Sequence, residues 1–539
     1  MTANPYPLLI KQILAAPLAQ KSPHEIVHAD IRRYGYPEFA ARIARLGGLL
    51  GELGLGQGST IAVMDWDSHR YLECFFAAPM IGATLHTVNI RLSAEQVLYT
   101  INHAGDDAIL CHVDFLPLLA DIRDRITRPF RLIVMQDNPV QAPADLQSDG
   151  EYEALMAEAT PVAGFPDFDE NTRATLFYTT GTTGAPKGVF YTHRQLVLHT
   201  LGVAAGLGPI PGSGFNRDDV YMPITPLFHV HGWGIPYVAT MLGAKQVYPG
   251  RYEAARLLSL ISEHRVTFSH CVPTILSMIL NAPGAEDADL SGWRVIIGGS
   301  ALSDALARSA RMRGVAINAA YGMSETCPFL TVADMMTTRT EPQATPNCTA
   351  AGKPMPMVDV RIVDETMSDV PADGVSTGEI VVRAPWLTSG YLNDPVGSGD
   401  LWRGGWLHTG DVGLFDASGA LRITDRLKDV IKTGGEWVSS LALENLASEV
   451  AGVSEAAAIG CPDPRWGERP LLIVASRRAA DDVKSDIRAR IAAAVTAGQL
   501  SKWATPDRIE IVSSLPKTSV GKLDKKALRA QYVIDKVQA

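Results

Sequence analysis

The chain has 539 residues, of which 46% are hydrophobic and 20% are charged. This length is too great for a single hydrophobic core, and the ordinary composition indicates a globular protein of two or more domains. The net charge of −10 argues against a nucleic-acid-binding protein, because such proteins present a basic face to the phosphate backbone.

Six cysteines are scattered along the chain, and no two are spaced as a redox motif or a metal knuckle. Scattered single cysteines are typical of the reducing cytoplasm. The first apolar run, residues 8–10, ends at Lys11 and follows no basic segment, so we expect no signal peptide. The most apolar long stretch, from Leu227 to Ala244, contains histidines, a proline and glycines. We interpret it as buried interior, so the sequence predicts a cytoplasmic protein without a membrane span.

Residues 1–170 alternate between helical and strand patterns. The periodicity of apolar residues predicts helices over 36–53 and 71–81 and strands over 61–64 and 84–88. This βαβ order predicts a largely parallel sheet. The segment 136–171 is rich in proline, aspartate and alanine, which favours a surface connection.

The middle and end of the chain continue this alternation. Short apolar runs predict a helix over 194–205 and strands over 174–177, 220–226, 266–270, 293–297 and 315–320. A β-hairpin is expected over 414–423, with its turn at 416–419. The composition changes near Asp425. We therefore predict an N-terminal domain over 1–425, a hinge over 426–428 and a C-terminal domain over 429–539.

The run from Tyr178 to Val189 follows a predicted strand and holds four threonines, three glycines and a lysine. Glycines let a backbone approach a ligand closely, and free N–H groups in such a loop form a concavity for anions. The hydroxyls add donors, and Lys187 adds a positive charge. A polar surface turn is the alternative, but this density of donors favours a polyphosphate ligand. Pro186 before the lysine and Gly188 after it distinguish the run from the nucleoside-triphosphatase loop.

Four shorter segments carry further candidate residues. They are Gly298 to Ala301, Tyr321 to Thr326, Leu407 to Asp411 and Pro516 to Lys522. Taken singly, each has an ordinary alternative: a tight turn, the start of a helix with a surface acid, a turn aspartate, or a solvated lysine in a basic tail.

The threonine-rich run resembles the phosphate loop of the adenylate-forming superfamily, which contains acyl-CoA synthetases, luciferases and peptide-synthetase adenylation domains. The resemblance extends from Tyr36 to Leu528, and the core motifs occur in order, which favours a function for the four shorter segments. One departure is Ser324, where the superfamily has threonine and the hydroxyl is kept. The resemblance implies an α/β fold: a large N-terminal domain of stacked βαβ layers plus a small β-barrel, and a small mobile α+β C-terminal domain.

The resemblance also implies roles for individual residues. The implied catalytic residues are Lys522, Glu325 and Thr179, of which Glu325 and Thr179 are expected to hold Mg²⁺. Tyr321 is expected to stack on adenine, and Asp411 to accept the ribose hydroxyls with support from Arg426. The residues implied to bind ATP are Thr179, Thr180, Gly181, Thr182, Thr183, Gly184, Lys187, Gly299, Ser300, Ala301, Ala320, Tyr321, Gly322, Met323, Ser324, Asp411, Arg426 and Lys432.

Two further segments are implied to bind the acid and coenzyme A. The acyl-pocket wall is expected at His229, Val230, His231 and Trp233. A metal pair is the alternative for the two histidines, but no third ligand accompanies them. The pantetheine tunnel is expected at Gly434, Gly435, Glu436 and Trp437, for which a simple loop is the alternative. Lys428 is implied as the hinge residue.

These parts imply an ATP-dependent acid–CoA ligase that forms an acyl-adenylate and acts as a homodimer. The stretch from Asp218 to Arg251 resembles the 3-methylmercaptopropionate–CoA ligases of marine bacteria, which degrade dimethylsulfoniopropionate. This favours a short acid such as 3-(methylthio)propanoate as the small-molecule partner, with ATP and coenzyme A. A medium- or long-chain fatty-acid CoA ligase is the nearest alternative, and a luciferase or an adenylation domain shares the ATP motifs. A non-catalytic ATP-binding sensor is expected to lose Lys522 or Glu325, and both are present.

Overall fold

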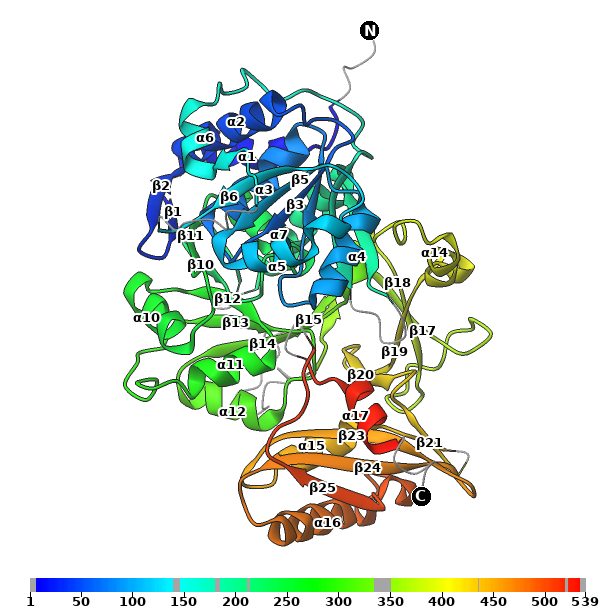
Figure 1. Ribbon diagram of the computed structural model, residues 1–539. Helices are drawn as coiled ribbons and strands as arrows, with labels where there is room; N and C mark the ends of the chain where they lie inside the picture. Colours follow the sequence, from blue (N-terminus) through cyan, green and yellow to red (C-terminus); the bar gives the residue numbers. More distant parts are fainter. Residues whose placement is uncertain are drawn as a thin grey trace.

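The computed structural model describes residues 6–138, 146–179, 185–210, 214–333, 350–434, 436–518 and 522–533. In these residues the strands form four sheets, of seven, nine, four and five strands. Figure 1 shows the five-stranded sheet, in orange and red, as a separate layer at the C-terminal end of the chain. Over the same ranges, no helix has the length and apolar character needed to cross a bilayer.

The seven-stranded sheet is built from the expected βαβ units. Its order is β7-β6-β5-β3-β4-β8-β9, and all its ladders are parallel except that between β8 and β9. The strands are β3 (Thr60–Met64), β4 (Thr84–Thr87), β5 (Ala108–His112), β6 (Arg131–Met135), β7 (Gly150–Glu151), β8 (Arg173–Thr179) and β9 (Lys187–Thr192). The helices are α2 (Tyr36–Glu52), α3 (His69–Met80), α4 (Ala94–Ala104), α5 (Leu116–Ile122), α6 (Tyr152–Glu158) and α7 (His193–Leu207), with 3-10 turns η1 (Val113–Phe115) and η2 (Arg123–Arg125). The predicted parallel sheet is confirmed.

Polar side chains begin several of these helices. The Ser68 hydroxyl accepts the Tyr71 N–H at the start of α3. The start of α7 has a reciprocal capping box between Thr192 and Gln195. Such caps satisfy N–H groups that have no partner inside the helix, so they place the helix starts directly after the strands.

The expected surface connection over 136–171 is wrong in part. β7 pairs with β6 in parallel, and α6 buries the ring of Tyr152. The Tyr152 hydroxyl donates to Glu73 on α3 at 2.6 Å. A strand of two residues and a helix of two turns are too short to show a hydrophobic period, so the sequence pattern could not reveal them.

The nine-stranded sheet has the order β16-β15-β14-β13-β12-β10-β11-β1-β2. Its strands are β1 (Glu25–His28), β2 (Arg32–Gly35), β10 (Val220–Pro223), β11 (Lys245–Tyr248), β12 (Phe268–Cys271), β13 (Arg294–Ile297), β14 (Ala316–Tyr321), β15 (Thr331–Val332) and β16 (Lys353–Pro354). The associated helices are α1 (Lys11–Ala19), α8 (Val230–Trp233), α9 (Ile235–Leu242), α10 (Ala254–His264), α11 (Pro273–Leu280), α12 (Asp304–Met312) and η3 (Ser324–Thr326). The strand expected over 220–226 ends at Pro223, because prolines at 223 and 226 lack the N–H that a ladder needs.

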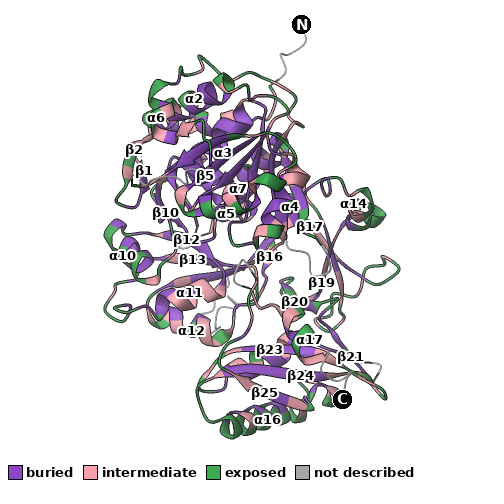
Figure 2. Cartoon of the chain, viewed as in Figure 1, coloured by how far each residue is buried: buried purple, intermediate pink, exposed green. Residues whose placement is uncertain are grey.

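One continuous hydrophobic core joins the two large sheets. It contains inward side chains of both sheets, such as Leu110 and Phe268, and residues of α3, α7 and α9. A second core covers the other face of the nine-stranded sheet, under α10, α11 and α12. Figure 2 shows the strands of both sheets as mostly buried. The stacked layers expected for the N-terminal domain are confirmed.

The four-stranded sheet replaces the expected small barrel. Its order is β17-β18-β19-β20, and no described ladder joins β17 to β20, so it is open. Its strands are β17 (Asp359–Val363), β18 (Gly378–Arg383), β19 (Leu407–Phe415) and β20 (Leu421–Arg426), with α14 (Pro395–Leu401) and η4 (Arg403–Gly405) between them. Closing a sheet into a barrel requires its two edge strands to pair, and in the described residues β17 and β20 do not. The hairpin expected over 414–423 is confirmed as β19 and β20.

The C-terminal part is a five-stranded sheet with helices on both faces. Its strands are β21 (Ile431–Thr433), β22 (Glu436–Val438), β23 (Val453–Asp463), β24 (Gly467–Ser476) and β25 (Arg508–Val512). Its helices are α15 (Ser440–Ser448), α16 (Ala480–Thr496), η5 (Lys502–Ala504) and α17 (Lys525–Val533). Two small cores lie in this part, one under α15 and α16 and the other under α17. Residues 427–430 connect β20 to β21 and include Lys428, the predicted hinge residue.

Candidate active site

The predicted phosphate loop lies between two paired strands. β8 ends at Thr179 and β9 begins at Lys187, and these two residues are partners in the antiparallel ladder. Thr180, Gly181, Thr182, Thr183 and Gly184 lie outside the described residues. The hairpin geometry therefore holds the Thr179 and Lys187 backbones side by side at the base of the loop.

Lys187 is connected to Glu325 through Tyr391. The Lys187 Nζ lies 4.4 Å from the centroid of the Tyr391 ring and 3.7 Å from an oxygen of Asp394. The Tyr391 hydroxyl donates to Glu325 Oε1 at 2.8 Å. No sequence motif marked Tyr391, because its place follows from a single backbone bridge between Val189 and Tyr391.

Glu325 is a buried carboxylate in the short turn η3. Its backbone carbonyl accepts the Thr388 N–H at 3.0 Å, and the carbonyl of Ser324 accepts the Tyr191 hydroxyl at 2.7 Å. Burial raises the pKa of Glu325, while the Tyr391 hydroxyl and the positive charge of Lys522 oppose that rise. The carboxylate is thus held rigidly and faces a lysine.

Tyr321, Asp411 and Arg426, which the resemblance assigns to the nucleotide, meet at one point. The Tyr321 hydroxyl donates to Asp411 Oδ2 at 2.8 Å, and Arg426 Nε lies 3.2 Å from Asp411 Oδ1. Burial raises the pKa of Asp411, and the nearby guanidinium of Arg426 opposes that shift. The three side chains come from β14, β19 and β20, so the site joins two sheets.

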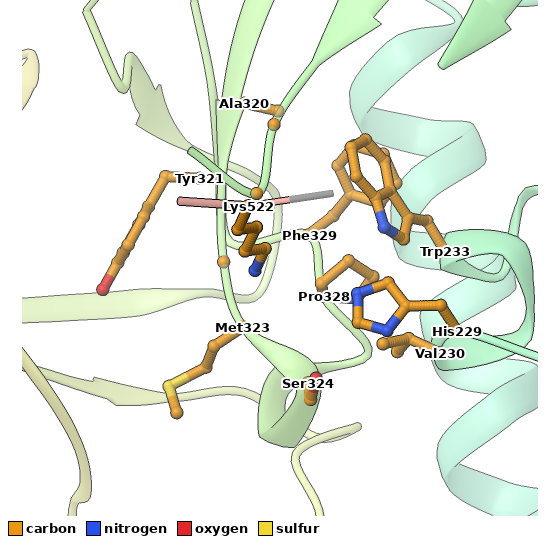
Figure 3. A pocket seen from close by; sticks show the side chains of 13 residues that line it. His229, Val230, Trp233, Ala320, Tyr321, Met323, Ser324, Pro328, Phe329 and Lys522 are labelled. Atoms are coloured by element: carbon orange, nitrogen blue, oxygen red, sulfur yellow. The ribbon is translucent and has the colours of Figure 1, made fainter. Parts of the chain in front are cut away.

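Lys522 reaches from the C-terminal part into a cavity of the N-terminal part (Figure 3). In Figure 3 its ammonium lies between Tyr321 on one side and His229 and Trp233 on the other. The Lys522 backbone N–H donates to the Thr518 hydroxyl at 3.2 Å. Burial, and the positive charge of Arg426, lower the pKa of Lys522 to about 8.

The cavity brings one part of the predicted residues together, from both the nucleotide and the acyl segments. It has a volume of about 30 Å³ and is lined by His229, Val230, Trp233, Gly298, Gly299, Ala320, Tyr321, Gly322, Met323, Ser324, Pro328, Phe329 and Lys522. Ser300 and Ala301 are exposed beyond this wall, and His231 is buried outside it. Lys432, Gly434, Glu436 and Trp437 also lie outside the cavity, and Gly435 lies outside the described residues.

The segment that carries His229, Val230 and Trp233 is a left-handed turn. Five consecutive residues have positive φ: Val230 (49°), His231 (55°), Gly232 (57°), Trp233 (59°) and Gly234 (70°). Each residue with a side chain costs about 1–2 kcal/mol in this conformation. Such strain persists only where the surroundings hold it, and it concentrates at functional sites.

The side chains of this turn point to opposite sides. Val230 and Trp233 line the cavity, and the Trp233 ring lies so close to Gly298 that a Cβ there would approach it to 3.1 Å. His231 instead packs edge-on against Phe75, Phe177 and Tyr191, with ring centroids 6.3, 5.1 and 5.8 Å away. The two histidines therefore do not converge on one point, which agrees with discounting a metal pair.

A second surface of interest surrounds the predicted pantetheine segment. Three tryptophans, each with a cation over its ring, lie on the C-terminal part: Lys432 over Trp437, Arg465 over Trp466 and Lys502 over Trp503, at 5.4, 4.5 and 5.5 Å. The rings of Trp466 and Trp503 are 4.7 Å apart. We call these six residues the tryptophan–cation surface. Sequence reasoning found only Trp437 and Lys432, because Trp466, in the turn before β24, and Trp503, in η5, lie far from Trp437 in the sequence.

Comparisons with known proteins agree with this arrangement. Residues 15–392 match the family model of the AMP-binding enzymes, and residues 442–522 match that of the AMP-binding enzyme C-terminal domain. The fold is similar to the crystal structure of the anthranilate CoA ligase AuaEII in complex with anthranoyl-AMP. The TM-score is 0.87 at 22% identity, over 99% of both chains, which supports the fold.

Curated relatives extend over almost the whole chain. A long-chain-fatty-acid–CoA ligase of Thermus thermophilus is 38% identical over 511 residues, covering 93% of this chain and 91% of that protein. A 3-methylmercaptopropionyl-CoA ligase of Ruegeria lacuscaerulensis is 35% identical over 536 residues, covering 98% and 97%. The chain therefore belongs to the AMP-binding enzyme family, in its branch of AMP-forming acyl-CoA ligases.

Proposed function

We propose that this enzyme joins a short carboxylic acid to coenzyme A in two half-reactions. In the first, the carboxylate attacks the α-phosphorus of ATP, and pyrophosphate leaves. In the second, the thiol of coenzyme A attacks the carbonyl of the acyl-adenylate, and AMP leaves. The observation that carries this proposal is the position of Lys522, which lies in one cavity with the nucleotide-side residue Tyr321 and the acyl-side residue Trp233.

Lys522 would supply positive charge where two anions meet. A carboxylate approaching a polyphosphate is repelled, and an ammonium between them removes that repulsion and stabilises charge that develops on the phosphoryl oxygens. Tyr321 would stack on adenine, and Asp411 would accept the ribose hydroxyls beside Arg426. Their mutual hydrogen bonds hold these groups in place before the substrate binds.

Thr179, Lys187 and Glu325 would hold the pyrophosphate end of ATP. Within the described residues no group of three or more histidine, cysteine or acidic side chains could enclose a metal ion. The Glu325 carboxylate and the Thr179 hydroxyl suit Mg²⁺, because Mg²⁺ typically takes one or two protein carboxylates and completes its shell with phosphates and water. Mg²⁺ bound at Glu325 and Thr179 would neutralise phosphate charge. The Glu325 carboxylate accepts the Tyr391 hydroxyl on one oxygen, and a carboxylate has further lone pairs with which it would bind this cation.

The second half-reaction would need a rotation of the C-terminal part about the hinge at 426–428. Lys522 would leave the cavity, and the segment Gly434 to Trp437 would enter to line the pantetheine tunnel. The tryptophan–cation surface supports this assignment, because aromatic rings and cations together suit the adenine and phosphates of coenzyme A. ATP and coenzyme A are the cosubstrates of this family.

The half-reactions can be separated with Lys522→Ala. We expect about 10²–10³-fold slower acyl-adenylate formation, the loss typical of one removed charge-stabilising group. Formation of the thioester from supplied acyl-adenylate should be largely spared. Pyrophosphate exchange measures the first step and release of AMP from acyl-adenylate the second. Equal losses in both assays would refute this division of labour.

The substrate is proposed to be a short acid such as 3-(methylthio)propanoate. The bulky rings of Trp233 and Phe329 line the cavity and would limit the length of an acid that lies against them. A relative named 3-methylmercaptopropionyl-CoA ligase supports a short acid, whereas relatives named long-chain and medium-chain fatty-acid ligases support the alternative.

A panel of acids of rising length decides between these substrates. We expect CoA-dependent release of AMP to be greatest with acids of three to five carbons or their thioether analogues. An optimum at eight carbons or more would contradict the short-acid proposal. No AMP release with any acid would favour the ATP-binding sensor instead. A homodimer in the cytoplasm remains a prediction, which sedimentation and fractionation would test.

A further inference from the structure

The left-handed turn lies where the two large sheets meet, and Asp67 bridges them. Asp67 follows β3 of the seven-stranded sheet, and its Oδ1 accepts the Leu227 N–H at 2.9 Å. Leu227 follows β10 of the nine-stranded sheet and begins the segment that leads into the turn. Asp67 Oδ2 accepts the Tyr252 hydroxyl, and its backbone carbonyl accepts the Gly250 N–H at 2.9 Å. One residue of the first sheet therefore holds two segments of the second.

A second contact from the same sheet acts on the next residue. The Thr87 hydroxyl, at the end of β4, donates to the Phe228 carbonyl at 3.0 Å. The guanidinium of Arg91 lies 5.8 Å from the centroid of the Phe228 ring and 5.9 Å from that of Tyr252. The segment just before the turn is thus held at the Leu227 N–H, the Phe228 carbonyl and the Phe228 ring.

Asp67 cannot change partners without a penalty. Its side chain is buried, with 3% of the residue exposed. A buried carboxylate is stable only when donors satisfy it, and removing one donor leaves an uncompensated charge. Burial raises the pKa of Asp67 to about 7, while the Leu227 N–H, the Tyr252 hydroxyl and Arg91 oppose that rise. The carboxylate and the segment it holds are therefore fixed relative to each other.

The turn transmits this constraint to the cavity. Left-handed backbone occupies a narrow range of φ and ψ, so the run from Val230 to Trp233 leaves little freedom between the start of the turn and the Trp233 ring. Val230 and Trp233 then project into the cavity beside Lys522 (Figure 3). A shift at the start of the turn would move the Trp233 ring.

We propose that Asp67 is a positioning residue for the acyl pocket. By holding the Leu227 N–H it fixes the start of the left-handed turn, which sets how far the Trp233 ring reaches toward Lys522 and which acid lengths are admitted. This inference rests on the proposed function, since it takes the acid to lie against Trp233.

Two substitutions at Asp67 test the inference. In Asp67→Ala the Leu227 N–H and the Tyr252 hydroxyl lose their acceptor. We expect the KM for the preferred acid to rise about tenfold and the preference among acids of two to ten carbons to flatten, a change on the scale of one methylene group. The KM for ATP should stay within about twofold, because Tyr321 and Asp411 are not touched.

Asp67→Asn is the conservative variant. Its carbonyl can accept the Leu227 N–H, and its amide can donate to the oxygen of Tyr252. We expect the wild-type order of acids and a KM within about threefold, given that the backbone contact is kept. If Asp67→Ala does not fold, Asp67→Ser is compared with Asp67→Asn: the shorter serine side chain does not reach the Leu227 N–H, so Asp67→Ser should broaden the preference more than Asp67→Asn does. The reverse order, or identical profiles, would overturn the inference.

Glu73→Ala is the matched control. Glu73 is equally buried, on α3, and accepts the hydroxyls of Tyr34 and Tyr152 and the guanidinium of Arg42, away from the cavity. It should lower the melting temperature and leave the preference among acids unchanged. A folded Asp67→Ala with the wild-type acid profile would overturn the inference, as would equal rises in the KM for acid and for ATP. Absence of ligase activity in the wild-type enzyme with every acid would instead overturn the proposed function.

Discussion

The ammonium of Lys522 carries a prediction about pH. Its pKa is lowered to about 8, because it is buried and lies near Arg426. A lysine with a lowered pKa is charged below that pH and loses its charge as the pH rises through it. We therefore expect kcat/KM for ATP in the adenylation half-reaction to fall above about pH 8, since this parameter reports the free enzyme.

The pH profile of pyrophosphate exchange measures this effect. Lys522→Arg is the control, because a guanidinium stays charged over the whole range. Its residual activity should not fall between pH 7 and pH 9.5. A wild-type profile that stays flat over the same range would mean that the charge of Lys522 is not needed in the first half-reaction.

Single site residues could be predicted from the sequence where they belong to a motif. Residues whose role depends on hydrogen bonds to distant parts of the chain were missed. The resemblance pointed to Tyr321, Asp411 and Lys522, and the structure brings these together. Tyr391 and Asp67 belong to no motif. Their importance comes from hydrogen bonds to residues far along the chain, Glu325 and Leu227, which a periodicity of apolar residues does not report.

Among the elements, long periodic ones were predictable and short ones were not. The helix expected over 36–53 is α2, Tyr36–Glu52, because a period of 3.6 residues is unmistakable over several turns. β7 and α6 were missed because they are too short to show any period. The stretch that contains the left-handed turn was predicted to be buried, and this is confirmed. Its backbone conformation could not be predicted, because no pattern of side chains indicates positive φ at valine, histidine and tryptophan.

Two glycines of α2 give a prediction at the scale of this helix. A Cβ on Gly48 would lie 1.8 Å from the Thr160 carbonyl oxygen, because the segment after α6 packs directly against the helix there. Gly48→Ala should lower the free energy of unfolding by about 1–3 kcal/mol through overpacking. Chemical denaturation measures the change.

Gly51→Ala is the matched control in the same helix. A Cβ on Gly51 would meet nothing within 4 Å. Alanine favours a helix over glycine by up to about 1 kcal/mol, so this substitution should leave stability unchanged or raise it. If both substitutions stabilise the protein, the close packing of residue 160 against α2 would be contradicted.

For the whole molecule, the sequence predicted a large N-terminal and a small C-terminal part, but not the contacts between them. The change of composition near Asp425 falls where β20 leads toward the C-terminal sheet. Asp425 itself is bound to the other part: its Oδ2 accepts the Ser440 N–H at 2.5 Å and its Oδ1 accepts the Ser440 hydroxyl at 3.0 Å. Lys525, three residues after Lys522, donates to the same hydroxyl at 2.7 Å and pairs with Glu444 at 2.6 Å. Of these contacts, only the Asp425–Ser440 bonds cross between the two parts, and we expect them to favour the orientation in which Lys522 occupies the cavity.

Ser440→Ala tests whether these contacts select that orientation. The substitution removes the hydroxyl that joins Asp425 to Lys525 and keeps the backbone N–H. A net hydrogen bond is worth about 0.5–1.5 kcal/mol, so the population of this orientation should fall about two- to tenfold relative to any other. We expect pyrophosphate exchange to slow by up to that factor, while thioester formation from supplied acyl-adenylate is unchanged or faster.

Ser448→Ala is the control, because its hydroxyl donates within α15, to the Glu444 carbonyl at 2.8 Å. Equal slowing of both half-reactions in Ser440→Ala would indicate general destabilisation and contradict a role in choosing between orientations.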